Sequence, residues 1–169
     1  VEQIVQNGSN CTPVTANSPA EYSFKNWTKN GNVYSTSNPL TVSNVTEKTS
    51  FVANFAINTY TLTYTDGDHG SISGQQIQTV NYGSDGMAVS AVPAEGYHFV
   101  MWSDSSTDNP RTDKNVTSNI TVIANFAINT YTLTYTASTN GSINGISSQT
   151  VSHGSNGSAV EAIPYEGYH

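Results

Sequence analysis

The sequence predicts an all-β chain, a tandem array of small strand-rich modules of about 71 residues that forms an elongated rod. Thr, Ser, Asn, Tyr, Val and Gly dominate the composition, and these residue types favour strands and turns. Leucine, a strong helix former, occurs only three times in 169 residues. A twelve-residue string that begins at Asn54 recurs unchanged at Asn125, 71 residues later.

The repeat predicts the domain organisation. The offset of 71 continues without a gap to the end of the chain and pairs, for example, Pro93 with Pro164. We therefore predict a complete repeat at 58–128 and a third repeat at 129–169 that is truncated before its Phe-x-x-Trp strand. The chain is then expected to be a window on a longer array.

The N-terminal segment is a weaker copy of the same unit. Its Tyr22-x-Phe24-x-x-Trp27 pattern matches Tyr97-x-Phe99-x-x-Trp102 at an offset of 75, whereas Asn38-Pro39 matches Asn109-Pro110 at 71. A four-residue insertion after the first tryptophan explains the difference, because a surface loop tolerates it at little cost. We predict that 1–57 is a partial repeat that lacks its first strand.

The complete repeat is expected to hold about five short strands. Over 60–65, Tyr and Leu alternate with Thr, which is the period of a half-buried strand. Glycine, proline and Asn-Pro turns bound the others. They are expected at 70–80 with a bend at Gly74, and at 88–92, 97–102 and 120–126.

The junctions between repeats contain no flexible linker. Only Ala56-Ile57-Asn58-Thr59 separates Phe55 from Tyr60, and the same four residues recur at 127–130. No Gly, Ser or Pro run is present to loosen the connection. We therefore predict a stiff or semi-stiff rod in place of loosely tethered modules. Ile57 and Ile128 are apolar residues that can pack between neighbouring repeats of the same chain.

The charge, the apolar pattern and the cysteine count argue against nucleic-acid binding, membrane insertion and an internal disulfide, respectively. The formal net charge is −7, from five Lys+Arg and twelve Asp+Glu, whereas nucleic-acid binding needs clustered Lys and Arg. No apolar run approaches the roughly 20 residues of a membrane helix, so no membrane insertion is expected in this segment. Cys11 is the only cysteine, which excludes a disulfide within the chain.

One family resemblance spans essentially the whole chain. Gly-Tyr-His-Phe-x-x-Trp-Ser-Asp at 96–104, Asn-Pro-Arg-Thr-Asp at 109–113 and the exit Ala-Asn-Phe at 124–126 resemble the divergent internalin-type B-repeat of bacterial surface proteins. The resemblance implies a β-grasp-like module, a location outside the cell and a role as stalk, spacer or adhesive surface. The N-terminal copy departs from the pattern, since Glu21 replaces the Gly of Gly-Tyr and Leu40 replaces Arg111.

No catalytic or cofactor-binding residue is predicted. Ser103, Asp104 and His98 suggest a Ser/His/Asp group, but Thr28, Lys29 and Ser23 stand at these positions in the first repeat. Nothing resembles the Gly-x-Ser-x-Gly turn of hydrolases. We expect the segment not to be an enzyme and to need no cofactor.

Three aspartates of the middle repeat resemble an oxygen-rich calcium site. They are Asp104, Asp108 and Asp113. The first repeat has no carboxylate at the positions equivalent to Asp104 and Asp108. A metal site common to all the repeats is therefore excluded. A single-copy site in the middle repeat stays an alternative to a solvated turn.

Aromatic and aliphatic residues at repeated positions are predicted to form the core. The strict Tyr-x-Phe-x-x-Trp spacing favours a buried tryptophan in each module, and the alternative is a sugar-stacking platform. The predicted core residues are Trp27, Phe55, Tyr60, Leu62, Trp102, Phe126, Tyr131 and Leu133.

Asn-x-Ser/Thr triplets provide candidate glycan acceptors for a secreted protein. Chains rich in Asn and Thr also produce such triplets by composition alone. The candidates are Asn7, Asn10, Asn26, Asn44, Asn115, Asn119, Asn140 and Asn156.

These observations predict an extracellular stalk, spacer or fibre of a large bacterial surface or secreted protein. Exposed strand edges invite pairing with other copies of the chain, so assembly into a filament belongs to the same hypothesis. The alternative is a module that binds carbohydrate or a host surface, with surface glycans as partners. Reading the parent gene on either side would distinguish these hypotheses.

Overall fold

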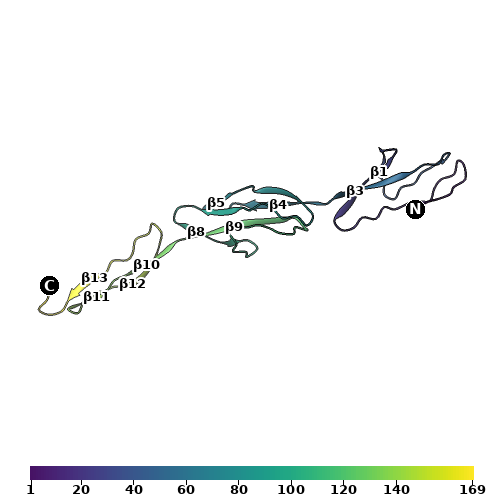
Figure 1. The fold of residues 1–169 in the computed structure, drawn as a ribbon. Coiled ribbons are helices and arrows are strands. Elements are labelled where there is room, and N and C mark those ends of the chain that lie inside the picture. Colours follow the sequence, from purple (N-terminus) through teal and green to yellow (C-terminus); the bar gives the residue numbers. More distant parts are fainter. The chain divides into compact units, whose positions relative to one another are not determined.

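The computed structural model describes Val1–His169, and its regular structure consists of thirteen strands and no helix (Figure 1). The all-β prediction is therefore confirmed. No element is a helix that is long and apolar enough to cross a membrane. The chain divides into two compact units. Unit 1 comprises Val1–Thr61, Thr79–Gly86 and Lys114–Asn119, and unit 2 comprises Leu62–Gln78, Met87–Asp113 and Ile120–His169.

Unit 1 contains a three-stranded antiparallel sheet in the order β2-β1-β3. The strands are β1 (Tyr22–Lys29), β2 (Asn32–Ser35) and β3 (Phe51–Ile57). Asn30 and Gly31 join β1 to β2 and have φ angles of 52° and 79°. Two consecutive left-handed residues match the right-handed twist of paired strands, which explains the Asn-Gly sequence at this hairpin. Trp27 and Leu40 are the buried side chains of this unit's first repeat.

The four-stranded sheet has the order β6-β4-β9-β8. Its strands are β4 (Thr59–Thr65), β6 (Ile77–Asn81), β8 (Tyr97–Trp102) and β9 (Ile120–Ile128). β9 pairs antiparallel with β8 and parallel with β4. Leu62, Tyr64, Val122 and Ala124 are buried on one face of the two central strands. The intervening residues of β4 are threonines, as the alternating sequence requires.

A second, smaller sheet of unit 2 pairs β5 (Gly70–Ser73) with β7 (Ser90–Pro93) antiparallel. The sequence predicted one bent strand over 70–80, but the structure contains two strands, β5 and β6, in different sheets. Gly74 lies between them with a φ of 113°, a conformation that turns the chain out of the first sheet. The complete repeat therefore has six strands, β4 to β9.

The C-terminal segment of unit 2 repeats the first part of this arrangement. β10 (Thr130–Thr134) pairs with β12 (Ser148–Ser152), and β11 (Gly141–Asn144) pairs with β13 (Glu161–Pro164). Gly145, at the position of Gly74, has a φ of 111° and separates β11 from β12 in the same way. The 71-residue sequence repeat is thus a repeat of backbone conformation.

The predicted core residues differ in burial. Trp27, Leu62 and Trp102 are buried, and Tyr60, Phe126 and Leu133 are half-buried. Phe55 and Tyr131 differ from the prediction, because 38% and 50% of their surfaces are exposed. Gly70 of β5 packs on the ring of Phe126, whereas the first repeat has no counterpart of β5 to cover Phe55. β10 has no parallel partner strand, which leaves Tyr131 open to solvent.

Candidate functional sites: a buried ion cluster and the repeat junctions

Arg111 occupies a buried position in the middle repeat and is 6% exposed. An isolated bridge to Val89 holds its backbone, with hydrogen bonds in both directions of 2.8 and 3.0 Å. Its guanidinium binds Asp113 through two bonds, from Nε to Oδ2 at 2.9 Å and from Nη2 to Oδ1 at 2.6 Å. Nη1 donates to Asp104 Oδ1 at 2.9 Å, and the guanidinium carbon lies 5.6 Å from the centre of the Trp102 ring.

The hydrogen bonds of this cluster determine its protonation. Burial opposes ionisation of Asp113, but the bonds from Arg111 and from the Tyr64 hydroxyl (2.7 Å) outweigh it, and the pKa of Asp113 lies below its ordinary value. The hydrogen bond from Arg111 lowers the pKa of Asp104. Burial, together with the bond to Asp113, raises the pKa of Tyr64. At neutral pH the cluster therefore contains one guanidinium, two carboxylates and a neutral phenol.

The three aspartates of the sequence-based metal hypothesis do not surround a common point. Asp104 and Asp113 converge on the guanidinium of Arg111, which already neutralises their charge. Asp108 contributes its backbone carbonyl, which accepts a bond from Trp102 Nε1 at 2.8 Å. The structure holds no group of three His, Cys, Asp or Glu residues arranged to hold a metal ion.

The role of Arg111 was not predicted from the sequence, although the sequence contains one signal for it. Leu40 occupies the equivalent position of the first repeat, is 5% exposed and pairs with Val14 as Arg111 pairs with Val89. A cation at a position where another copy has a buried leucine indicates a buried ion pair. In the first repeat, Lys29 occupies the position equivalent to Asp104 and forms an ion pair with Glu47 at 2.9 Å.

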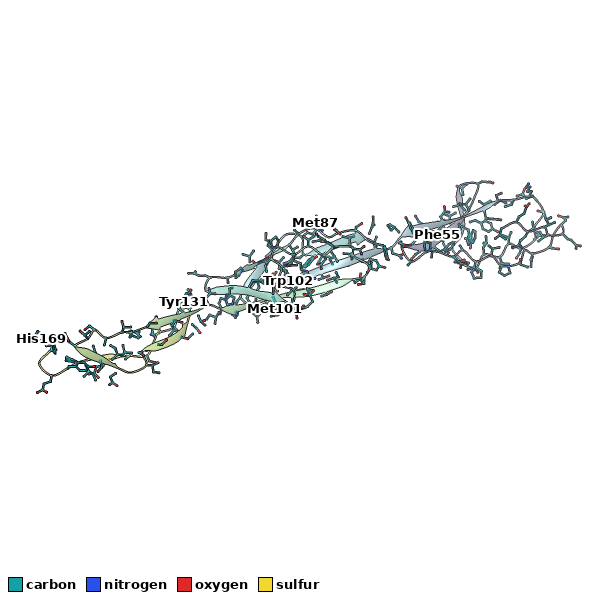
Figure 2. The ribbon with its side chains drawn as sticks, turned by 60° about the horizontal axis from the view of Figure 1, so that its bottom comes forward. Phe55, Met87, Met101, Trp102, Tyr131 and His169 are labelled. Carbon is teal, nitrogen blue, oxygen red and sulfur yellow. The ribbon has the colours of Figure 1, made fainter.

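Both tryptophans lie inside their repeats. Trp102 is 0% exposed and Trp27 is 7% exposed, and Figure 2 shows Trp102 within the middle repeat. The rings of Phe24 and Phe99 pack on them at centroid distances of 5.8 and 5.7 Å. Trp27 Nε1 donates to the carbonyl of Ser37 at 3.1 Å. Neither ring presents a free face on which a sugar could stack.

Two buried glutamines form a second repeated set of hydrogen bonds, which was not predicted from the sequence. Gln78 donates to the carbonyls of Gln75 (3.0 Å) and Met87 (2.9 Å), and its Oε1 accepts from the Met87 N–H at 2.7 Å. Gln149, 71 residues later, makes the corresponding bonds to Ile146 and Ser158. These bonds tie the loop before β7 to β6 and satisfy a polar side chain that is costly to bury unpaired.

Asn58 joins the first repeat to the second within unit 1. Its N–H donates to the carbonyl of Glu21 at 2.8 Å, and its side-chain amide donates to the carbonyl of Ala20 at 2.8 Å. Its Oδ1 accepts from the Ser23 hydroxyl. On the other side, its carbonyl accepts from the N–H of Tyr82 at 2.8 Å. One residue therefore bonds to β1 of one repeat and to the segment after β6 of the next.

Asn129 makes the corresponding contacts at the second junction, within unit 2. Its N–H donates to the carbonyl of Gly96 at 2.8 Å, and its carbonyl accepts from the N–H of His153 at 2.8 Å. Nδ1 of His98 lies 2.8 Å from its Oδ1, where Ser23 stands in the first junction. The two junctions are thus built on the same pattern with different side chains.

The candidate glycan acceptors lie outside the strands, except for Asn26, which lies within β1. Seven of them are exposed, namely Asn7, Asn10, Asn44, Asn115, Asn119, Asn140 and Asn156. Asn26 is half-buried, and its Oδ1 accepts a bond from the Asn54 amide at 2.9 Å. The Oδ1 of Asn119 accepts from the N–H of Thr61 at 2.9 Å. Modification of Asn26 would require this contact to be given up.

Comparison with known protein families identifies the repeat. The family model described as the divergent InlB B-repeat domain matches residues 2–59, 60–130 and 131–169. No curated protein and no solved structure matches the chain.

Proposed function

Because this chain belongs to the divergent InlB B-repeat family, we propose that it acts as a stalk, spacer or fibre segment of a large bacterial surface or secreted protein. The family suggests a repeat region of a surface protein and an extracellular location. It is a repeat-domain family rather than an enzyme family, and the proposed role needs no catalytic residue and no cofactor.

The observation that supports this role is the repeated junction. Asn58 bonds to Glu21 and Tyr82, and Asn129 bonds to Gly96 and His153, so each residue contacts both the repeat before it and the repeat after it. Only four residues separate the Phe that ends one repeat from the Tyr that opens the next, and none of them is Gly, Ser or Pro. A spacer needs such junctions, because its reach depends on neighbouring modules holding a fixed direction. The partners in this role are neighbouring repeats of the same chain.

Small-angle X-ray scattering of the 169-residue chain tests the proposal. A compact globule of this length has a radius of gyration of about 15 Å. A stalk segment is expected to exceed this value clearly, with circular dichroism showing that it remains folded. Double replacement of Asn58 and Asn129 by alanine is expected to broaden the distribution of interatomic distances. The control is the double variant Asn32→Ala and Asn125→Ala at exposed positions, which is expected to leave that distribution unchanged. A radius near 15 Å for the native chain would contradict the proposal.

Self-assembly and glycan binding are separate outcomes with their own measurements. Sedimentation at rising concentration detects a fibre that grows by pairing of strand edges. A glycan array probes the carbohydrate-binding alternative, for which the two buried tryptophans supply no platform. Reproducible binding to one glycan class, lost on replacement of an exposed tyrosine such as Tyr34, would favour the alternative over the stalk.

A further inference from the structure

The first and last strands of the complete repeat are adjacent to its two junctions. β4 begins at Thr59, directly after Asn58, and β9 ends at Ile128, directly before Asn129. A tension applied along an array of repeats therefore enters the middle repeat at the start of β4 and leaves it at the end of β9. The contact between these two strands decides how the repeat resists that tension.

β4 and β9 are neighbours in the sheet and run parallel (Figure 1). Their register pairs Leu62 with Ile120 and continues through Thr63, Tyr64 and Thr65 to Ile123. Pulling β4 by its start and β9 by its end slides one strand along the other. All the hydrogen bonds between them are then loaded together, whereas strands pulled apart from one end break their bonds one after another.

Further contacts reinforce the same pair of strands. Asn119 Oδ1 accepts from the Thr61 N–H at 2.9 Å, which adds a bond beyond the last backbone pair. The side chains of Leu62, Tyr64 and Val122 are buried on one face of this strand pair. Water therefore does not reach the hydrogen bonds between the strands from that face. After β4, Gly67 packs its Cα directly on the carbonyl of Ala124, where no Cβ fits.

We infer that β4 and β9 form a mechanical clamp, which allows the complete repeat to resist tension applied along the array of repeats. This function rests on the proposed role as a stalk and adds a load-bearing site to it. The clamp residues are Thr61 to Thr65 of β4 and Asn119 to Ile123 around the start of β9. The sheets formed by β1–β3 and by β10–β13 contain only antiparallel pairs, which makes them an internal comparison.

Single-molecule force spectroscopy on the full chain, held at its two ends, tests the clamp. One dominant high-force event is expected, and it releases the segment from Thr59 to Ile128, roughly 230–250 Å when extended. The segments on either side are expected to extend at lower force before it. A trace in which the middle repeat extends at the same low force as its neighbours would overturn the inference.

A disulfide between the two strands tests whether the high-force event is the separation of β4 from β9. In a Cys11→Ser background, Thr63→Cys and Thr121→Cys place two thiols at paired positions. Oxidation is expected to shorten the high-force release by roughly 190–210 Å, the extended length of the enclosed chain, and reduction to restore it. An unchanged release length with the disulfide formed would place the barrier elsewhere.

The direction of pulling supplies the decisive comparison. Handles attached at Thr65→Cys and Ile123→Cys, which are paired at the far end of the same two strands, separate them one bond at a time. The force is expected to fall to less than half of that measured through the ends of the chain. Equal forces in the two directions would show that shear of β4 against β9 is not the barrier.

A side-chain variant tests the reinforcement without disturbing the core. Asn119→Ala removes the bond to Thr61 and is expected to lower the high-force event, whereas Asn125→Ala, exposed and without a side-chain hydrogen bond, is the matched control. Equal forces for the two variants would remove Asn119 from the clamp. Failure of all these measurements would reject the clamp alone, because the scattering experiment tests the stalk independently.

Discussion

Gly96 lies directly against the imidazole of His153, and a Cβ added at Gly96 would overlap the ring. Gly96 belongs to the complete repeat and His153 to the next, and both are in unit 2. Gly96 also has a φ of 81°, a conformation that residues with a Cβ adopt at a cost. Two independent physical reasons therefore require glycine at this junction. The first junction has Glu21 and Tyr82 at the equivalent positions, so its contact is built differently.

Gly96→Ala is expected to destabilise the chain more than Gly154→Ala does. Both positions have a left-handed φ, of 81° and 73°, and the strain of about 1–2 kcal/mol is common to them. Only Gly96 adds a clash, since nothing lies within 4 Å of a Cβ at Gly154. Urea denaturation of the two variants measures the difference. Equal losses would mean that His153 moves away at no cost.

Trp102→Ala is expected to lower the free energy of unfolding by about 3–5 kcal/mol, because a fully buried ring is lost from the middle repeat. Met101→Ala, at a neighbouring position that is 38% exposed, is the control and is expected to cost much less. Chemical denaturation with tryptophan and tyrosine fluorescence follows both. A Trp102→Ala variant within about 0.5 kcal/mol of the native chain would contradict its role as the core residue.

Arg111→Leu is expected to cost about 3 kcal/mol, because it leaves the carboxylate of Asp113 without its partner. The first repeat has Leu40 and Val42 at the positions of Arg111 and Asp113. Arg111→Leu combined with Asp113→Val and Tyr64→Phe is therefore expected to recover most of that stability, because no buried polar group is left unpaired. Asp104 also loses Arg111, but its side chain is 41% exposed and remains solvated. If the triple variant were less stable than Arg111→Leu alone, the ion cluster would contribute more than charge neutralisation.

Acid is expected to weaken the same cluster. The pKa values of Asp104 and Asp113 are lowered in the folded chain, so the unfolded chain takes up protons first as the pH falls. Their stabilising contribution is present above the unfolded aspartate pKa of about 3.9 and is lost as the pH falls below it. Thermal melts between pH 3 and 7 are expected to show a shallower acid loss for Asp113→Asn than for the native chain. Parallel pH profiles would exclude Asp113 as a source of the dependence.

Alkaline pH is expected to act through Tyr64. Its pKa is raised by burial and by the bond to Asp113, so the folded chain keeps the phenol proton after the unfolded chain has lost it. The stabilising contribution is present below the unfolded tyrosine pKa of about 10 and declines above it. Tyr64→Phe is expected to reduce this alkaline loss, whereas Tyr34→Phe, at an exposed position, is not. The same decline in all three chains would contradict the assignment.

Strand content and the repeat were predictable because they are properties of short windows of sequence. The alternation over 60–65 defines which residues of β4 face inward, and Leu62 and Tyr64 are buried as the alternation requires. The sequence predicts a bend within one strand at Gly74, but this residue, with a φ of 113°, separates two strands that belong to different sheets. A sequence marks where the chain can turn, but it does not state which strand receives the chain afterwards.

The amino-acid sequence by itself determined the all-β class, the 71-residue repeat and the family, because each rests on local periodicity or on identity between segments. Only the tertiary structure decided that Arg111 lies buried between Asp104 and Asp113, that Asn58 and Asn129 bond across the junctions, and that β4 lies parallel to β9. These contacts join residues far apart in the chain. Their formation depends on the packing of whole strands, which no local pattern records.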